Sequence, residues 1–178
     1  PRTQVDPQLI GLTPGSRKQE TDRMWPVFLA VARKIREEHP DRRFRMVSPV
    51  PQVDIPSWIQ RCDTIEDLSS ASAVLTKSGT VTLELAVMGV PQVVAHQVHP
   101  ITHWLGQRLV HGIRHIAMPN ILAGTEVIPE FVQDLRPGLL ASALMGLPDH
   151  QEVDLSALGE AGVVRRTADQ VGQWMDLT

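Results

Sequence analysis

Residues 71–91 read Ala-Ser-Ala-Val-Leu-Thr-Lys-Ser-Gly-Thr-Val-Thr-Leu-Glu-Leu-Ala-Val-Met-Gly-Val-Pro, and this stretch decides the fold. Its first part, 71–76, is a short apolar run of the kind that forms a buried strand. A helix is predicted directly after it, because Ser78 is a favourable N-cap, Gly89 is a favourable C-terminal stop and Pro91 prevents continuation. A strand that turns directly into a helix is the repeating unit of an α/β sheet.

The same alternation runs through the rest of the chain. Pro26 suits the first turn of a helix, and the helical spacing of Phe28, Val31 and Ile35 gives that helix a buried face. The predicted strands are 9–13, 43–48, 71–76, 92–96 and 115–118, and the predicted helices are 26–39, 78–89, 102–111, 129–133, 136–147, 155–158 and 166–174. Short apolar strands between helices predict a doubly wound, Rossmann-like α/β fold, in which helices cover both faces of a parallel sheet.

The length of 178 residues suits one domain with a core of its own. We expect residues 1–8 to be an extended lead-in and residues 9–178 to form the domain, with its C-terminal helices in 136–178. Residues 49–56 hold three prolines and predict an irregular connection. The chain begins at Pro1 rather than at methionine, and we therefore expect it to be part of a longer protein.

Composition excludes several classes of function. The net charge is −3 and there is no long basic run, which argues against a nucleic-acid partner. Cys62 is the single cysteine, so an internal disulfide is excluded and a reducing compartment is favoured. Apolar runs such as 138–146 are far too short to span a bilayer.

Two turns carry several residues that can bind a ligand, and we call them the loaded turns. The first loaded turn, residues 13–17, follows the strand at 9–13. In such sheets ligands bind at the carboxyl ends of the strands. Gly15 lets the backbone approach a ligand closely, Ser16 can donate a hydrogen bond, and Arg17 can bind a phosphate group through two N–H donors. The alternative is a surface turn with a solvated arginine.

The second loaded turn follows the strand at 71–76. Free backbone N–H groups at the start of the following helix favour an anion, and Ser78, Gly79 and Thr80 would supply this helix start. Glu84 lies one turn further on the same face, where a carboxylate can accept hydrogen bonds from both hydroxyls of a ribose. The alternative is a capped helix with a solvated glutamate.

A third cluster lies further along the chain. Asn120 follows the predicted strand 115–118, and Glu130 and Gln133 lie in the predicted helix 129–133. We expect these residues to approach the same edge of the sheet, although each of them could simply cap a helix.

No metal or cofactor is expected. His96, His99 and His103 crowd one connection, but cysteine and carboxylate partners are absent nearby in the sequence, which favours surface or substrate-facing roles. The chain also lacks an Asp-x-Asp pair. We therefore expect Arg17 and the two turns to neutralise a diphosphate by preorganised electrostatics, without a metal ion.

Four motifs, taken in order, resemble those of the lipid-A-disaccharide synthase family. The motifs are Leu-Thr-Pro-Gly-Ser-Arg at 12–17, Ser-Gly-Thr-Val-Thr-Leu-Glu at 78–84, Pro-Asn-Ile-Leu-Ala-Gly at 119–124 and Pro-Glu-Phe-Val-Gln at 129–133. One such motif would be a weak signal, but four with matching order and spacing are a strong one.

The resemblance implies one half of a GT-B glycosyltransferase, namely its C-terminal domain. The family joins UDP-2,3-diacylglucosamine to 2,3-diacylglucosamine 1-phosphate and releases UDP. The implied activity is that of an inverting hexosyltransferase, and the absence of an Asp-x-Asp pair leads us to expect that it is metal-independent. By this likeness Ser16 and Arg17 meet the diphosphate, residues 78–80 present the helix start and Glu84 holds the ribose. The resemblance also implies that Asn120, Glu130 and Gln133 lie near the donor cleft.

The resemblance implies partners as well: a UDP-sugar donor, a lipid-linked sugar acceptor, an N-terminal GT-B domain and a membrane surface. The catalytic base is expected in that N-terminal domain, so this chain alone should be inactive. The implied location is cytoplasmic, on the inner face of the inner membrane.

The sequence departs from the family pattern at three places, one of which is the stretch between Ser48 and Ala71, which is short for the family. His96-Gln97 stands where the family has tyrosine followed by a basic residue, and Thr13 stands where leucine is usual. Two alternatives are therefore kept. One is another UDP-sugar GT-B enzyme, such as an epimerase or a peptidoglycan-type transferase, which would not be expected to carry the third and fourth motifs. The other is a non-catalytic nucleotide-sugar-binding module.

Overall fold

The computed structural model describes residues 4–51, 53–97, 115–151 and 153–158, together with 162, 165 and 168–170. The predicted helix 102–111, most of the predicted helix 166–174, and His99 and His103 lie outside these residues. The described elements are β1 (Asp6–Thr13), α1 (Lys18–Glu38), β2 (Arg43–Val47), β3 (Ile59–Cys62), the 3-10 helix η1 (Ile65–Leu68), β4 (Ala71–Lys77), α2 (Val81–Val87), β5 (Gln92–His96), α4 (Met118–Ala123), β6 (Glu130–Val132), α5 (Pro137–Met145) and the 3-10 helix η2 (Ser156–Leu158).

The described strands form one parallel sheet of six strands in the order β3-β2-β1-β4-β5-β6. The chain runs outward from β1 to β3 on one side, returns to β4 at the centre and then runs outward on the other side. The strand order therefore reverses between β1 and β4, the place where open α/β sheets bind ligands.

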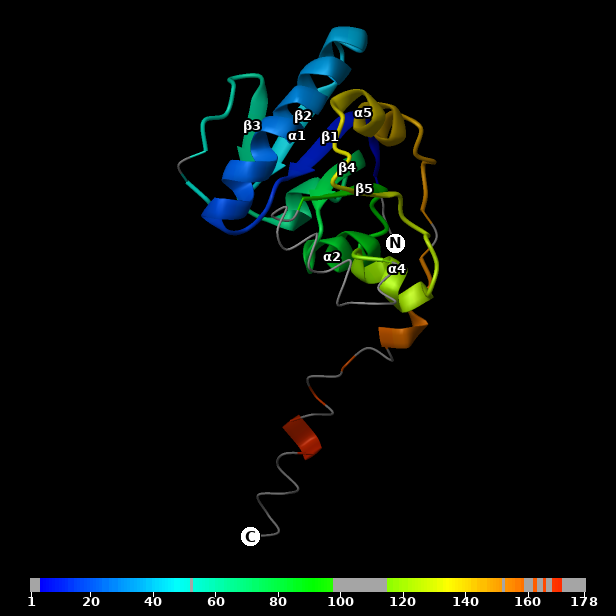
Figure 1. Cartoon of the computed structure of the whole chain (residues 1–178). Helices are drawn as coiled ribbons and strands as arrows, with labels where there is room; N and C mark the ends of the chain where they lie inside the picture. The colour runs from blue at the N-terminus through cyan, green and yellow to red at the C-terminus, as the bar shows by residue number, and fades with distance from the viewer. Residues whose placement is uncertain are drawn as a thin grey trace.

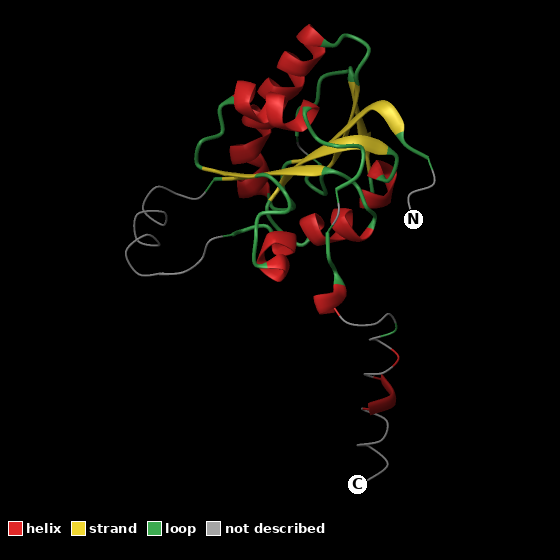
Figure 2. Cartoon of the chain, turned by 90° about the vertical axis from the view of Figure 1, so that its right-hand side faces the viewer, coloured by secondary structure: helices red, strands yellow, loops and turns green. Residues whose placement is uncertain are grey.

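Helices cover both faces of this sheet. Figure 1 shows α1 and α5 on one side of the strands and α2 and α4 on the other, and the turned view in Figure 2 agrees. The predicted Rossmann-like α/β fold is confirmed. None of the described helices has both the length and the apolar character needed to cross a bilayer.

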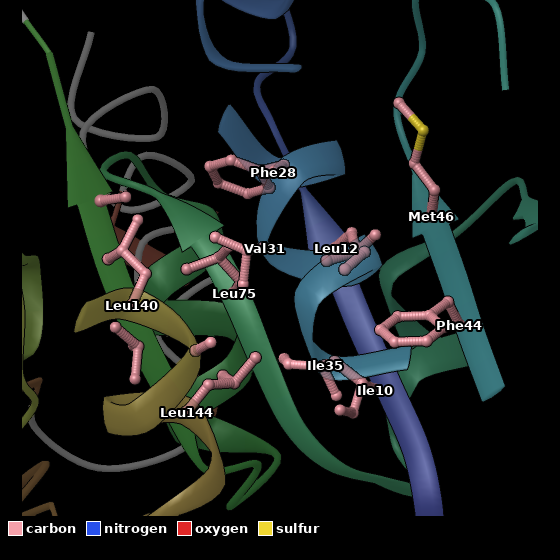
Figure 3. Packing of buried hydrophobic residues seen from close by; sticks show 14 of the residues in the cluster. Ile10, Leu12, Phe28, Val31, Ile35, Phe44, Met46, Leu75, Leu140 and Leu144 are labelled. Atoms are coloured by element: carbon pink, nitrogen blue, oxygen red, sulfur yellow. The ribbon is translucent and has the colours of Figure 1, made fainter. Parts of the chain in front are cut away.

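The larger core cluster lies between the sheet and the layer formed by α1 and α5. Phe28, Val31 and Ile35 of α1 are completely buried, which confirms the buried face predicted from their spacing. Figure 3 shows these side chains, together with Leu140 and Leu144 of α5, packed over residues of β1, β2 and β4. A second cluster lies on the opposite face, between the sheet and the elements η1 and α2.

The first strand and helix begin earlier than predicted. β1 starts at Asp6, so the end of the predicted lead-in 1–8 belongs to the sheet. α1 starts at Lys18, so Pro26 is inside the helix and not in its first turn. A proline there removes the hydrogen bond to the carbonyl of Asp22, one turn earlier. Pro26 and Asp22 are both exposed, so water can satisfy that carbonyl.

Two further predictions of secondary structure were wrong, and one strand was not predicted. Residues 115–118 form no strand, since α4 begins at Met118 with Pro119 in its first turn. Residues 129–133 form no helix, because Glu130–Val132 pairs with β5 as β6. β3 was missed because only Ile59 among its residues is buried, which leaves no alternating pattern to detect.

Candidate functional site

The two loaded turns open into one cavity of about 410 Å³ at the C-terminal ends of β1 and β4. These strands are neighbours, with Thr13 opposite Thr76, so the turn after each strand reaches the same edge of the sheet. All of the predicted site residues of these two turns line the cavity: Gly15, Ser16, Arg17, Ser78, Gly79, Thr80 and Glu84.

The first turn is fixed mainly through its backbone. Gly15 has a φ of +136°, and a Cβ there would lie 3.0 Å from Cβ of Glu20, so the position requires glycine. The Gly15 carbonyl accepts hydrogen bonds from the hydroxyls of Thr21 (3.2 Å) and Ser48 (3.3 Å). The side chain of Arg17 is 81% exposed, and its guanidinium forms an ion pair with Glu20 at the mouth of the turn.

The second turn differs from its prediction in one respect. Ser78 does not cap the helix, because α2 begins only at Val81 and the Ser78 hydroxyl donates to the carbonyl of Ile116 at 3.1 Å. Its single O–H donor is therefore already used. Gly89 has a φ of +70° just after the helix, which confirms it as the C-terminal stop. Glu84 is exposed and lines the cavity as expected.

Two charged residues of the cavity were missed by sequence reasoning. Lys77 Nζ lies 3.1 Å from Glu20 Oε1, and the same oxygen lies 3.2 Å from Arg17 Nη1. Burial alone would raise the pKa of the Glu20 carboxyl, but Lys77 and Arg17 together lower it below its ordinary value. The available signal was the position of Lys77 as the last residue before the Ser-Gly-Thr turn.

Asn120 does not line the cavity. Its side chain is fully buried, and its Nδ2 donates to the Ile128 carbonyl at 2.7 Å. Its Oδ1 accepts from the backbone N–H groups of Val127 (2.9 Å) and Ile128 (2.8 Å). Asn120 therefore closes the loop between α4 and β6.

Glu130 lies behind the second turn and also outside the cavity lining. Its Oε2 accepts from the backbone N–H groups of Ile116 (2.9 Å) and Ala117 (2.8 Å), and its Oε1 lies 2.8 Å from Nδ1 of His115. Since the Ile116 carbonyl holds the Ser78 hydroxyl, Glu130 is connected to the cavity through this segment. Gln133, with a φ of +67°, donates its backbone N–H to the His96 carbonyl at 3.0 Å.

We expect His96 to make the stability of the chain depend on pH. Burial and the positive charge of Lys77 lower the pKa of this half-buried histidine below 6.5, against opposing effects of Glu20 and Glu130. Between the lowered pKa and 6.5 the unfolded chain binds more protons than the folded chain, so stability rises with pH in that window. We expect acidification from pH 7.5 through this window to destabilise the wild type more than a His96→Gln variant.

Urea unfolding of both proteins at several pH values measures this difference. A His39→Gln variant is the matched control, because His39 is exposed at the end of α1. Equal pH dependence in the wild type and His96→Gln would contradict the prediction.

Within the part of the chain that the structure describes, no three His, Cys, Asp or Glu side chains come together in a way that could hold a metal ion. The charged residues that line the cavity are Arg17, Lys77, Glu20 and Glu84. These side chains bring two cations and two carboxylates to the edge of the cavity beside the turn at 78–80.

A parallel sheet with its cavity at the switch in strand order defines a Rossmann-like α/β domain. The structure of UDP-GlcNAc 2-epimerase from Methanocaldococcus jannaschii in complex with UDP-GlcNAc and UDP has this fold too, with a TM-score of 0.58 and 11% identity over 95% of this chain and 46% of that chain. A second structure of that epimerase gives a TM-score of 0.55 at 14% identity, with the same coverage of both chains. Likeness at such low identity shows the fold alone.

The chain belongs to the lipid-A-disaccharide synthase family. The family model described as lipid-A-disaccharide synthetase matches residues 2–144. The lipid-A-disaccharide synthase of Geobacter sulfurreducens is 38% identical over 143 residues, which cover 73% of this chain and 37% of that protein. The synthase of Gluconobacter oxydans is 36% identical and covers 92% of this chain and 43% of that protein. The family predicted from the four motifs is thus confirmed, and the chain spans less than half the length of these relatives.

Proposed function

We propose that this chain is the donor-binding domain of a glycosyltransferase that joins UDP-2,3-diacylglucosamine to 2,3-diacylglucosamine 1-phosphate and releases UDP. The observation that carries the proposal is the convergence of two family motifs, 12–17 and 78–84, on one cavity at the strand-order switch. A cavity of about 410 Å³ lies in the range typical of small-molecule sites.

The donor would lie across the two turns. Arg17, Ser16 and the backbone near Gly15 would bind the diphosphate, and the backbone of Gly79 and Thr80 would add N–H donors. Glu84, which also lines the cavity, would hold the ribose hydroxyls. The negative charge that develops on the departing UDP would then be stabilised by fixed cations and dipoles rather than by a metal ion, in an inverting displacement.

Asn120, Glu130 and Gln133 would support the donor site from behind. The Asn120 side chain binds the backbone of the loop between α4 and β6, the Glu130 carboxylate binds the backbone just before α4, and the backbone N–H of Gln133 binds the end of β5. The support for this role is the hydrogen-bonded path from Glu130 through Ile116 to Ser78.

The remaining parts of the reaction would come from outside this chain. An N-terminal GT-B domain would close the cavity, bind the lipid-linked acceptor and supply the catalytic base. The lipid substrates would place the whole enzyme on the cytoplasmic face of the inner membrane. The chain alone would bind UDP without turning over. The support is that it covers only 37% and 43% of the two relatives described above.

Titration of the chain with UDP by isothermal calorimetry tests the donor site. We expect Glu84→Ala to weaken UDP binding by about tenfold or more, because hydrogen bonds to a charged group contribute about 1.5–3 kcal/mol. Glu66→Ala is the matched control, since Glu66 is an exposed acid of η1 outside the cavity lining. Absence of heat at millimolar UDP in the wild type would exclude the proposed site.

Another UDP-sugar enzyme with this fold is the second candidate. The likeness to UDP-GlcNAc 2-epimerase covers 95% of this chain, but the match to the synthase family over residues 2–144 favours the transferase. Release of UDP from a diacylglucosamine donor by the complete protein would support the transferase. Interconversion of a UDP-sugar with its 2-epimer would support the epimerase, and UDP binding without either reaction would support a non-catalytic module.

A further inference from the structure

Lys77 occupies a position in the cavity to which none of the four motifs assigns a role. We propose that Lys77 is a second diphosphate-binding cation of the donor site, and that Glu20 is the positioning residue that holds its ammonium group there. This inference rests on the proposed function, since it takes the ligand to be a nucleoside diphosphate.

The first argument is the burial of a charge. Lys77 is the last residue of β4, and only 16% of its side chain is exposed, although it lines the cavity. Lysine side chains usually extend into water, and a covered ammonium group loses hydration that must be replaced. A largely covered lysine at the end of a central strand therefore lowers stability unless its ammonium group binds a partner or a ligand.

The second argument is the geometry around Glu20. A single oxygen, Oε1, lies within 3.2 Å of both Lys77 Nζ and Arg17 Nη1. One carboxylate thus faces two cations, so the group of three carries a net positive charge beside the turn at 78–80. A diphosphate placed there would gain attraction from both cations while Glu20 keeps them from repelling each other.

The third argument is the number of donors. An ammonium group has three N–H donors, and Glu20 is the partner that the described residues give to Lys77. Donors therefore remain for a ligand on the cavity side.

Lys77 and Arg17 differ in mobility, because the Arg17 side chain is 81% exposed and Lys77 is held on a strand. Lys77 would provide a preorganised contact and Arg17 an adjustable one.

The competing explanation is a purely structural ion pair that ties α1 to β4. A structural pair would shape the whole cavity, so its loss would weaken the binding of any ligand there. A phosphate-binding cation would matter for UDP and not for uridine, which has no phosphate groups. The difference between these two probes therefore separates the explanations.

The experiment titrates the 178-residue chain with UDP and with uridine, followed by NMR shifts of backbone amides. We expect Lys77→Met to raise the Kd for UDP by about tenfold to a hundredfold, as expected for loss of a charge-assisted hydrogen bond, and to change the Kd for uridine less than about twofold. Glu20→Gln is expected to show the same selectivity with a smaller loss, of about threefold to tenfold. Lys77→Arg should recover most of the UDP affinity, because it keeps the charge.

The matched control is Lys34→Met, which removes an equal charge from the far end of α1 outside the cavity lining and should leave both constants unchanged. Unchanged UDP binding in Lys77→Met would overturn the inference and leave the proposed function standing. Equal weakening of UDP and uridine would overturn it in favour of the structural ion pair. A wild-type chain that binds neither compound would overturn the proposed function and this inference with it.

Discussion

Glu130→Ala is expected to lower the free energy of unfolding by about 3 kcal/mol, because removing a partner from a buried, hydrogen-bonded network costs about 1–3 kcal/mol for each group left unpaired. The Glu130 side chain is only 6% exposed, and it accepts from the N–H groups of Ile116 and Ala117 and contacts His115. Both N–H groups would lose their partner in the variant. Urea denaturation of the wild type and the variant measures the difference.

Two further variants make the Glu130 experiment specific. Glu130→Gln keeps one acceptor oxygen and should lose less stability than Glu130→Ala. Glu38→Ala removes an exposed carboxylate from the end of α1 and should leave the unfolding free energy nearly unchanged. If Glu130→Ala behaved like Glu38→Ala, the hydrogen bonds of Glu130 would not contribute to the free energy of unfolding.

Phe28→Ala is expected to cost about 3–5 kcal/mol, the usual range when a buried aromatic side chain is truncated to alanine in a close-packed core. Phe28 is completely buried in the cluster between α1 and the sheet, where α5 closes the same layer (Figure 3). The truncation would leave a cavity that the regular elements around it cannot easily fill. Thermal unfolding followed by circular dichroism should show a clearly lower Tm.

Val87→Ala is the matched control for the core variant. Val87 is an apolar residue of a helix as well, but it is 63% exposed at the end of α2. We expect its truncation to change the unfolding free energy by less than about 0.5 kcal/mol, as is usual for surface positions. A similar loss in both variants would contradict the assignment of the core to the face that Phe28 presents.

The central part of the fold could be predicted from the sequence because its signals are local. The strands at 71–77 and 92–96 each contain a run of three apolar residues, 73–75 and 93–95, and the buried face of α1 repeats at helical spacing. β3 and β6 are edge strands with one and no fully buried residue, respectively. They are strands because a neighbouring strand offers them hydrogen bonds, and that partner cannot be recognised from four or three residues.

The functional site, too, could be predicted only where its residues are close together in the sequence. Each loaded turn carries its chemistry in consecutive residues, so both turns could be recognised and both line the cavity. The contact of Lys77 with Glu20 joins β4 to α1, and that of Ser78 with Ile116 joins two distant turns. Side-chain contacts of this kind depend on the assembled sheet. Asn120 likewise looks like a loop residue in the sequence, but its amide is used up within the fold.

The adjacency of β1 and β4 has a consequence for biosynthesis. In the finished sheet β1 is hydrogen-bonded on both sides, but β4 is translated only after α1, β2 and β3. One edge of β1 therefore has no hydrogen-bonding partner while the intervening chain is made. An apolar strand with an unpaired edge can pair with another chain and aggregate. Once β4 has been made, its pairing with β1 covers that open edge. The same pairing brings the two cavity turns together. A nucleotide that binds only the sheet with β1 and β4 paired would shift the folding equilibrium toward that paired state by mass action.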